Sequence, residues 1–406
     1  MRHQVTRPAA RIPALSFIFI TIVLDVLALG VVIPVLPRLI SEFLNNDTVH
    51  AAETVGAFAT LWALMQFLCS PILGGLSDHF GRRPVILLSN FGLGLDYIFM
   101  GFAPSLGWLL VGRVISGITS ASFATAAAYI VDVTSPEKRA AGFGVQGAAF
   151  GLGFVLGPAL GGLLGAVDVR LPFWTAAALS LGNGVYGSFI LPESLPLERR
   201  KQFSWKRANP IGSLALLRSN HRLLGLALIA LLSNLAHEAL PSTFVLYVGF
   251  RYGWDQQTIG FSLAAIGLCS AIVQGGMVRP LTTRLGERGM ALTGLTFGII
   301  GFFCLGSSRS GSLMWIAIPS LALWGMFGPA AQSLMSRCVP ASEQGLLQGA
   351  LSSLKGVTGM IGPGLFSLTF SFFIGANAFG DGVPGAPYIL ASLLLCGALF
   401  EMRRRF

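Results

Sequence analysis

Long apolar segments recur along the chain, and short polar or glycine- and proline-containing stretches separate them. Each segment has roughly the 20 residues that an α-helix needs to cross a bilayer. The chain is 53% hydrophobic and 11% charged, whereas soluble domains carry about 25% charged residues. We therefore predict an all-α integral membrane protein with twelve transmembrane helices, which start near residues 13, 54, 84, 107, 142, 172, 222, 257, 288, 312, 344 and 386.

The positive charges are distributed unevenly between the two sets of predicted loops. The net charge is +10, which on its own could suggest nucleic acid as a partner. If both ends lie on one side, that side holds 21 of the 27 Lys and Arg residues, and the opposite loops hold four. Basic residues concentrate in cytoplasmic loops. The charge thus predicts two cytoplasmic termini, a lipid bilayer as the surroundings and no nucleic-acid partner.

Two features at first suggest other classes of protein. The start of the chain is basic and then apolar, but the run over 12–36 is too long for the apolar core of a signal peptide, so we expect a retained first span. The five cysteines lie in or at the ends of predicted spans, without spacing for zinc or for a disulfide framework. We therefore expect neither a metal site nor another cofactor.

The chain contains an internal repeat. Gly81 and Gly157-Pro158 recur in matching sequence contexts as Gly286 and Gly362-Pro363, both at an offset of 205 residues. A charged, proline-containing stretch follows the sixth predicted span. The sequence thus predicts pseudo-symmetric six-helix bundles over 1–192 and 222–406, joined by a cytoplasmic linker over 193–221. A binding site between parallel repeats is typical of one class of secondary transporter.

Several motifs carry a resemblance to a known family. GGLSDHFGRRP (74–84), Gly112-Arg113 through Gly117 and GLGFVLGPALGG (151–162) resemble motifs of the drug/proton antiporters of the major facilitator superfamily. LDVLALGVVIPVLPRL (24–39), GWDQQTIGFSLAAIGL (253–268) and LLQGALSSLKGVTGMIGPGLF (346–366) are similar to its tetracycline/proton antiporters. The resemblance extends from about residue 15 to 400.

The resemblance implies a proton-coupled exporter of an amphipathic drug-like compound in the bacterial inner membrane, working as a monomer by alternating access. The chain differs from the tetracycline branch at Ser270, where that branch usually has histidine, and at Gly298, where it usually has aspartate. A transporter of the same fold for a metabolite or siderophore, even an importer, therefore remains an alternative. The sequence shows no P-loop and no catalytic constellation, so we expect neither ATP hydrolysis nor an enzyme.

Ionisable residues inside predicted spans are candidates for binding protons or substrate. Each costs about 2.5–3.5 kcal/mol at the bilayer centre on insertion scales, so it needs a partner or a function. Depth along the helices suggests one ion pair between Asp25 and Arg113 and another between Glu238 and Lys355. Purely structural pairing is the alternative in each case. The six candidates are Asp25, Asp96, Arg113, His237, Glu238 and Lys355.

Two motifs predict structural devices. For the turn between the second and third spans, the resemblance implies a cytoplasmic gate. Asp78 would pair with Arg82 or meet a helix of the other half, and Asp132 would be a second partner for Arg82. Glycines at every fourth position of the fifth span predict that a neighbouring helix packs closely against it. This packing would help to seal the path toward the outside. The gate residues are Gly74, Asp78, Gly81, Arg82, Arg83 and Asp132, and the antiporter motif contains Gly153, Gly157, Pro158 and Gly161.

Overall fold

The computed structural model describes residues 11–120, 122–134, 139–200, 202, 216–217, 220–340, 343–375 and 382–405. Over these residues the chain forms helices and no β-strand, which confirms the predicted all-α fold. The helices are α1 (Arg11–Val32), α2 (Leu36–Phe43), α3 (Thr48–Phe80), α4 (Arg82–Gly101), α5 (Leu106–Thr119), α6 (Ser122–Val133), α7 (Arg139–Val167), α8 (Leu171–Ile190), η2 (Leu197–Arg199), α9 (His221–His237), α10 (Ala239–Tyr252), α11 (Gln256–Ile272), η4 (Val273–Met277), α12 (Val278–Ser307), α13 (Gly311–Trp324), α14 (Phe327–Ser336), α15 (Gln344–Ile374) and α16 (Ala386–Arg405).

Ten stretches of helix in the described part of the chain are long and apolar enough to cross a membrane. One of them, Gln256–Ser307, contains a sharp break at Gly286, where φ is +67°, so it holds two of the predicted spans. α8 is not among the ten. Each predicted start lies in or next to a helix, and the count of twelve crossings stays a prediction.

Side-chain caps fix several helix starts. The carboxylate of Asp47 accepts hydrogen bonds from the backbone N–H groups of Val49 and His50, at 3.0 and 3.2 Å, and so begins α3 six residues before the predicted start. Asp255 accepts from the N–H of Thr258 at 2.8 Å and begins α11. Such caps satisfy backbone donors that a helix start leaves unpaired.

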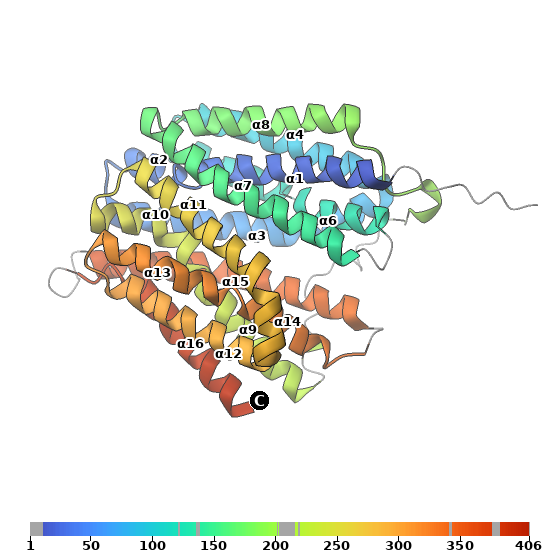
Figure 1. Ribbon diagram of the computed structural model, residues 1–406. Coiled ribbons are helices and arrows are strands. Elements are labelled where there is room, and N and C mark those ends of the chain that lie inside the picture. Colours follow the sequence, from blue (N-terminus) through green and yellow to red (C-terminus); the bar gives the residue numbers. More distant parts are fainter. Residues whose placement is uncertain are drawn as a thin grey trace, which may run out of the picture.

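The helices form two groups, which we call the first half (α1–α8) and the second half (α9–α16). In the first half α1 packs against α7 and α8, and α4 packs against α8; in the second half α12 and α9 both pack against α16. Figure 1 shows the first half, in blue to green, above most of the second half. Much of the predicted linker 193–221 lies outside the described residues, so the domain boundaries stay predictions.

We define two ends of the molecule. The base carries the turn at Gly81 and the break at Gly286; the far end carries the loops before α3 and α11. The halves contact one another through α3 on α15 and α7 on α11. Near the far end these contacts are tight: a Cβ on Gly260 of α11 would lie 2.8 Å from the Cα of Gly162 of α7.

The contacts between the halves do not continue to the base. A Cβ on Gly74 of α3, Gly147 of α7 or Gly275 of η4 would meet no atom of the described residues within 4 Å. Gly356 of α15, near mid-length, is the last glycine of that helix in contact with α3, where it packs on Phe67. Among the described glycines, those at the far end thus mark tight contact between the halves, and those toward the base face open space.

Candidate functional site

Asp25 lies near the middle of α1 and is held by an amide on α8. The Nδ2 of Asn183 donates to Oδ1 of Asp25 and to the carbonyl of Thr21, both at 2.9 Å. Asn183 is fully buried, and its Oδ1 has no hydrogen-bond partner within the described residues. A buried amide that donates twice to one helix fixes the carboxylate in place. Asn183 is a site residue that the sequence did not reveal.

Asp96 of α4 is buried beside Arg113 of α5. Its side chain is 1% exposed, and neither carboxylate oxygen has a hydrogen-bond partner among the described residues. The charge of Arg113 acts on Asp96, while the guanidinium Nη2 lies 3.7 Å from Sδ of Met100. Gly112 provides the space, because a Cβ there would lie 3.2 Å from Oδ1 of Asp96. The two opposite charges thus lie in the same region, without an ion pair within 4 Å in the described part of the chain.

Tyr97 connects the two carboxylates. Its side chain is 2% exposed, and the charges of Asp25, Asp96 and Arg113 all act on it. The structure thus gathers three of the six predicted ionisable residues, from three helices, around one buried tyrosine. Together with Asn183 they form what we call the first-half polar cluster.

The predicted ion pair between Asp25 and Arg113 is not observed. Among the ion pairs of the described residues, none joins these two side chains within 4 Å. Each has a nearer neighbour on another helix: Asp25 has the amide of Asn183, and Arg113 faces α4. The depths of Asp25 and Arg113 along their helices predicted the region in which both lie, but not the neighbour that each side chain contacts.

In the second half, two candidates lie where a helix is interrupted. Glu238 is both the C-cap of α9 and the N-cap of α10, and His237 precedes it. Interrupted helices are common at transporter binding sites, because they expose backbone groups and side chains at mid-depth. The ring of His237 is exposed and lies 5.7 Å from the indole of Trp324, measured between ring centroids.

The predicted pair between Glu238 and Lys355 is also not observed. Within the described residues no carboxylate lies within 4 Å of the Lys355 ammonium. The side chain of Glu238 packs instead on Gly362 of α15, seven residues from Lys355. At 1.5 Å per residue that spacing is about 10 Å along the helix axis, or about two turns. The charge of Lys355 acts on His237.

The base of the first half carries the ion pairs predicted for Arg82. Its Nη1 lies 2.6 Å from Asp78 and 2.7 Å from Oγ of Ser77, and its Nε lies 3.0 Å from Asp132 at the end of α6. The Arg82 side chain is 11% exposed. We call these residues the Arg82 latch; it joins α3, α4 and α6. All its members belong to the first half, so Asp78 uses the partner within its own half.

Glu193 extends the Arg82 latch to the segment that follows α8. Its two carboxylate oxygens accept from the backbone N–H groups of Arg82 and Arg83, at 2.9 and 3.3 Å. Ser194 adds a hydrogen bond of 3.3 Å from its hydroxyl to Asp132. Arg83 donates to the carbonyl of Ser188. A carboxylate at a helix start is favourable because it meets unpaired donors and the positive end of the helix dipole.

Glycines around the Arg82 latch behave differently from one another. Gly81 has φ +108° and ψ +161°, a conformation that is almost exclusive to glycine, and this confirms the tight reversal predicted there. As a glycine at the end of the second span, Gly74 predicts close helix packing there. That expectation is wrong for the described residues, because a Cβ on Gly74 would meet open space.

The glycines of the antiporter motif allow close packing, as predicted. A Cβ on Gly153 would lie 2.8 Å from Val26, and one on Gly157 would lie 2.7 Å from Cα of Gly30, both on α1. Gly161 packs on the backbone of Val31. The next contact reaches the other half, where Gly260 of α11 meets the carbonyl of Pro158. The motif thus packs α7 on α1 and also forms part of the far-end contact.

The position of Gly298 has no room for a side chain. A Cβ there would lie 2.8 Å from Cγ and Cδ1 of Trp324 and 2.7 Å from Cδ1 of Leu395. The Trp324 indole N–H donates to Oγ of Ser233 at 3.2 Å, which holds the ring in place. Trp324 therefore fills the space where the tetracycline branch, according to the resemblance, usually places an aspartate.

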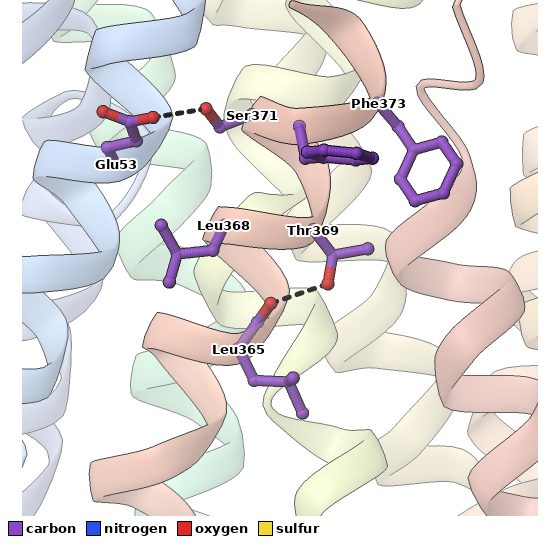
Figure 2. A pocket seen from close by; sticks show the side chains of 7 residues that line it. Glu53, Leu365, Leu368, Thr369, Ser371 and Phe373 are labelled. Carbon is purple, nitrogen blue, oxygen red and sulfur yellow. Dashed lines mark hydrogen bonds between the residues drawn. The ribbon is translucent and has the colours of Figure 1, made fainter. Parts of the chain in front are cut away.

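A groove of about 460 Å³ lies at the far end between α3 and α15. Figure 2 shows Glu53 and Ser371 joined across it by a hydrogen bond of 2.7 Å, which links the two halves. Leu368 and Phe372 line it and are 59% and 58% exposed. These exposed apolar side chains place the groove on the outer surface of the helix bundle, away from the first-half polar cluster and from Lys355.

The family model described as Major Facilitator Superfamily matches residues 18–400. The chain belongs to the major facilitator superfamily. The predicted family is thus confirmed over nearly the whole chain, and it agrees with two halves of packed helices that touch at one end.

Curated relatives place the chain near one branch of the superfamily. Tetracycline resistance protein, class C, of Escherichia coli is 38% identical over 353 residues, covering 86% of this chain and 88% of that protein. Class G of Vibrio anguillarum is 38% identical over 388 residues, covering 94% and 95%. The solved structure of the nucleoside transporter NupG is similar in fold, with a TM-score of 0.78 at 13% identity, covering 97% of this chain and 100% of that one.

Proposed function

We propose that the protein is a proton-coupled secondary transporter that exports an amphipathic drug-like compound, of the tetracycline type or chemically related to it. The observation that carries the proposal is the asymmetric contact between the halves: they touch at the far end and stand apart at the base, and each half holds ionisable groups at mid-depth. Relatives named as tetracycline resistance proteins support export as the direction.

The distribution of basic residues assigns the base to the cytoplasm of a bacterial inner membrane. The structure then represents an inward-open state, in which substrate enters from the cytoplasm. Export requires the far-end contacts to open and the base to close. The tight contact of Gly162 with Gly260, and the hydrogen bond between Glu53 and Ser371, would have to break in that step.

The first-half polar cluster supplies the groups for proton binding. Asp25 is the proton acceptor in this proposal, because it is partly exposed and faces the amide of Asn183. A protonated Asp25 could donate to the unpaired Oδ1 of Asn183 after rotation of that amide, so both protonation states have a partner. Arg113 lies near the buried Asp96, and we propose that protonation of Asp25 changes the charge balance of this cluster.

The Arg82 latch keeps the base of the first half together during this movement. Because Arg82, Asp132 and Glu193 link four segments of one half, we propose that the first half moves as a rigid body. A single chain contains both halves and the whole path, so we propose that a monomer transports without a cofactor, using the proton gradient.

Expression in an efflux-deficient bacterial strain tests the proposal. We expect increased resistance to at least one compound among tetracyclines, phenicols and quinolones, and we expect a proton uncoupler to restore accumulation of that compound in cells. No change in susceptibility to any of these compounds would contradict drug export and favour a metabolite transporter of the same fold.

A further inference from the structure

Lys355 faces the space between the two halves. On α15 the exposed apolar side chains Ile361, Leu368 and Phe372 mark the lipid-facing side. Lys355 lies six residues before Ile361, which turns it about 120° away from that side at 3.6 residues per turn. The next residue, Gly356, packs on the ring of Phe67 in the first half. Lys355 is exposed, so its side chain reaches the gap that opens from this contact toward the base.

Lys355 forms no ion pair with a described residue. Its charge acts on the ring of His237, which is exposed on the same wall, and no carboxylate lies within 4 Å. Glu238, the predicted partner of Lys355, packs on Gly362 about two helical turns away along α15. An exposed ammonium group that has no ion pair among the described residues can bind an anionic group of a substrate through charge-assisted hydrogen bonds.

On the same wall the position of Gly298 has no room for an acidic group, and the acidic Glu238 packs on Gly362. The ring of Trp324 occupies the space next to Gly298, so no carboxylate fits at that position without moving the indole. The indole in turn lies against His237. The wall of the second half therefore presents Lys355 and His237, and the partly exposed ring of Phe67 lies beside them on the first half.

We infer that the exported compound carries a carboxylate or a comparable anionic group that binds to Lys355, while its apolar body lies against Phe67. This inference rests on the proposed export function and specifies its substrate class. Charge-assisted hydrogen bonds from the ammonium group would provide the selectivity for anions. The ring nitrogens of His237 are further polar groups in the same region.

Transport into everted membrane vesicles tests the inference with matched probes: nalidixic acid, ciprofloxacin, the methyl esters of both, neutral chloramphenicol and the cation ethidium. At a pH where the acids are ionised, we expect wild-type protein to transport at least one acid with a KM about tenfold below that of its ester. Lys355→Gln should raise the KM for that acid about tenfold with little change in kcat, and leave the ester unchanged.

Two variants serve as controls. Lys355→Arg keeps the charge and should retain the preference for the acid, which excludes misfolding as the cause of the loss. Arg403→Gln removes a cation from the exposed end of α16 and should change neither KM.

The results test two claims separately, the anionic substrate class and drug export. Equal KM values for acids and esters, an unchanged preference in Lys355→Gln, or transport of chloramphenicol or ethidium alone would overturn the anionic substrate class and leave drug export standing. Transport of none of these probes by wild-type protein would overturn the anionic substrate class. If tetracycline is not transported in the same vesicles either, the result contradicts the proposed function itself.

Discussion

The base of each half carries the same turn with the charges reversed. In the first half Arg82 follows Gly81 and pairs with Asp132; in the second half Glu287 follows Gly286 and pairs with Arg337 at 2.6 Å. Both pairs of positions differ by the 205 residues of the internal repeat. The geometry of the ion pair is thus kept while its polarity is inverted.

The two turns differ in how many groups they join. Arg82 is 11% exposed and meets Asp78, Asp132 and Ser77, while Glu193 caps the following helix. Arg337 is 73% exposed, and Glu287 adds only a hydrogen bond from Ser333 at 2.6 Å. Arg82 with its several partners is harder to replace than the single pair of the exposed Arg337 and Glu287, whose side chain is 15% exposed. The comparison suggests that the first half is the rigid one at its base.

Substitution of the arginines should give the largest difference in effect between the two turns. Arg82→Gln leaves Asp78 and Asp132 close together without a cation, so we expect a loss of about 3 kcal/mol in the free energy of unfolding and transport below a tenth of wild type. Arg337→Gln should cost less than about 1 kcal/mol. Unfolding in detergent and vesicle transport at matched abundance measure both. Equal losses in the two variants would contradict the difference between the turns.

The glycines of the two turns offer a second contrast. Gly81 and Gly286 both have positive φ, which costs a residue with a Cβ about 1–3 kcal/mol. At Gly81 that Cβ would also collide with the carboxylate of Glu193, whereas at Gly286 it meets no described atom within 4 Å. Gly81→Ala should therefore destabilise the protein more than Gly286→Ala, as measured by the midpoint of detergent unfolding. The reverse order would show that the contact with Glu193 is unimportant.

An exchange of charges should have the smallest effect. The double variant Glu287→Arg with Arg337→Glu restores the pair with the polarity of the first half, so we expect transport within about twofold of wild type. The matched exchange, Arg82→Glu with Asp132→Arg, places a glutamate beside Asp78 and should fail. Growth under drug selection compares the two, and tolerance of both exchanges would mean that only one ion pair matters in each turn.

The sequence predicted the helices well because apolar length is a local property. Its errors lie where capping or packing decides. α3 starts at Thr48 because Asp47 caps it, and the interruptions near Ser120, at Glu238 and at Gly325 depend on neighbouring helices. No pattern along one segment of chain reports those neighbours.

The contacts of the site also divide into local ones, which the sequence predicts, and long-range ones, which it does not. The pair of Asp78 and Arg82 was predictable because four residues along a helix bring side chains together. The hydrogen bonds of Asn183 to Asp25 and of Glu193 to Arg82 join residues 158 and 111 positions apart, so only the fold brings them together. Long-range partners of this kind also explain why two predicted ion pairs were wrong.

Proton-driven transport by Asp25→Asn tests the account most directly. In this variant an amide of similar size replaces the carboxylate that Asn183 contacts, so the protein should reach the membrane at normal abundance. We predict that everted vesicles energised by respiration no longer accumulate the drug, while downhill exchange of drug continues. Wild-type accumulation in this variant would remove Asp25 from proton coupling and contradict the account.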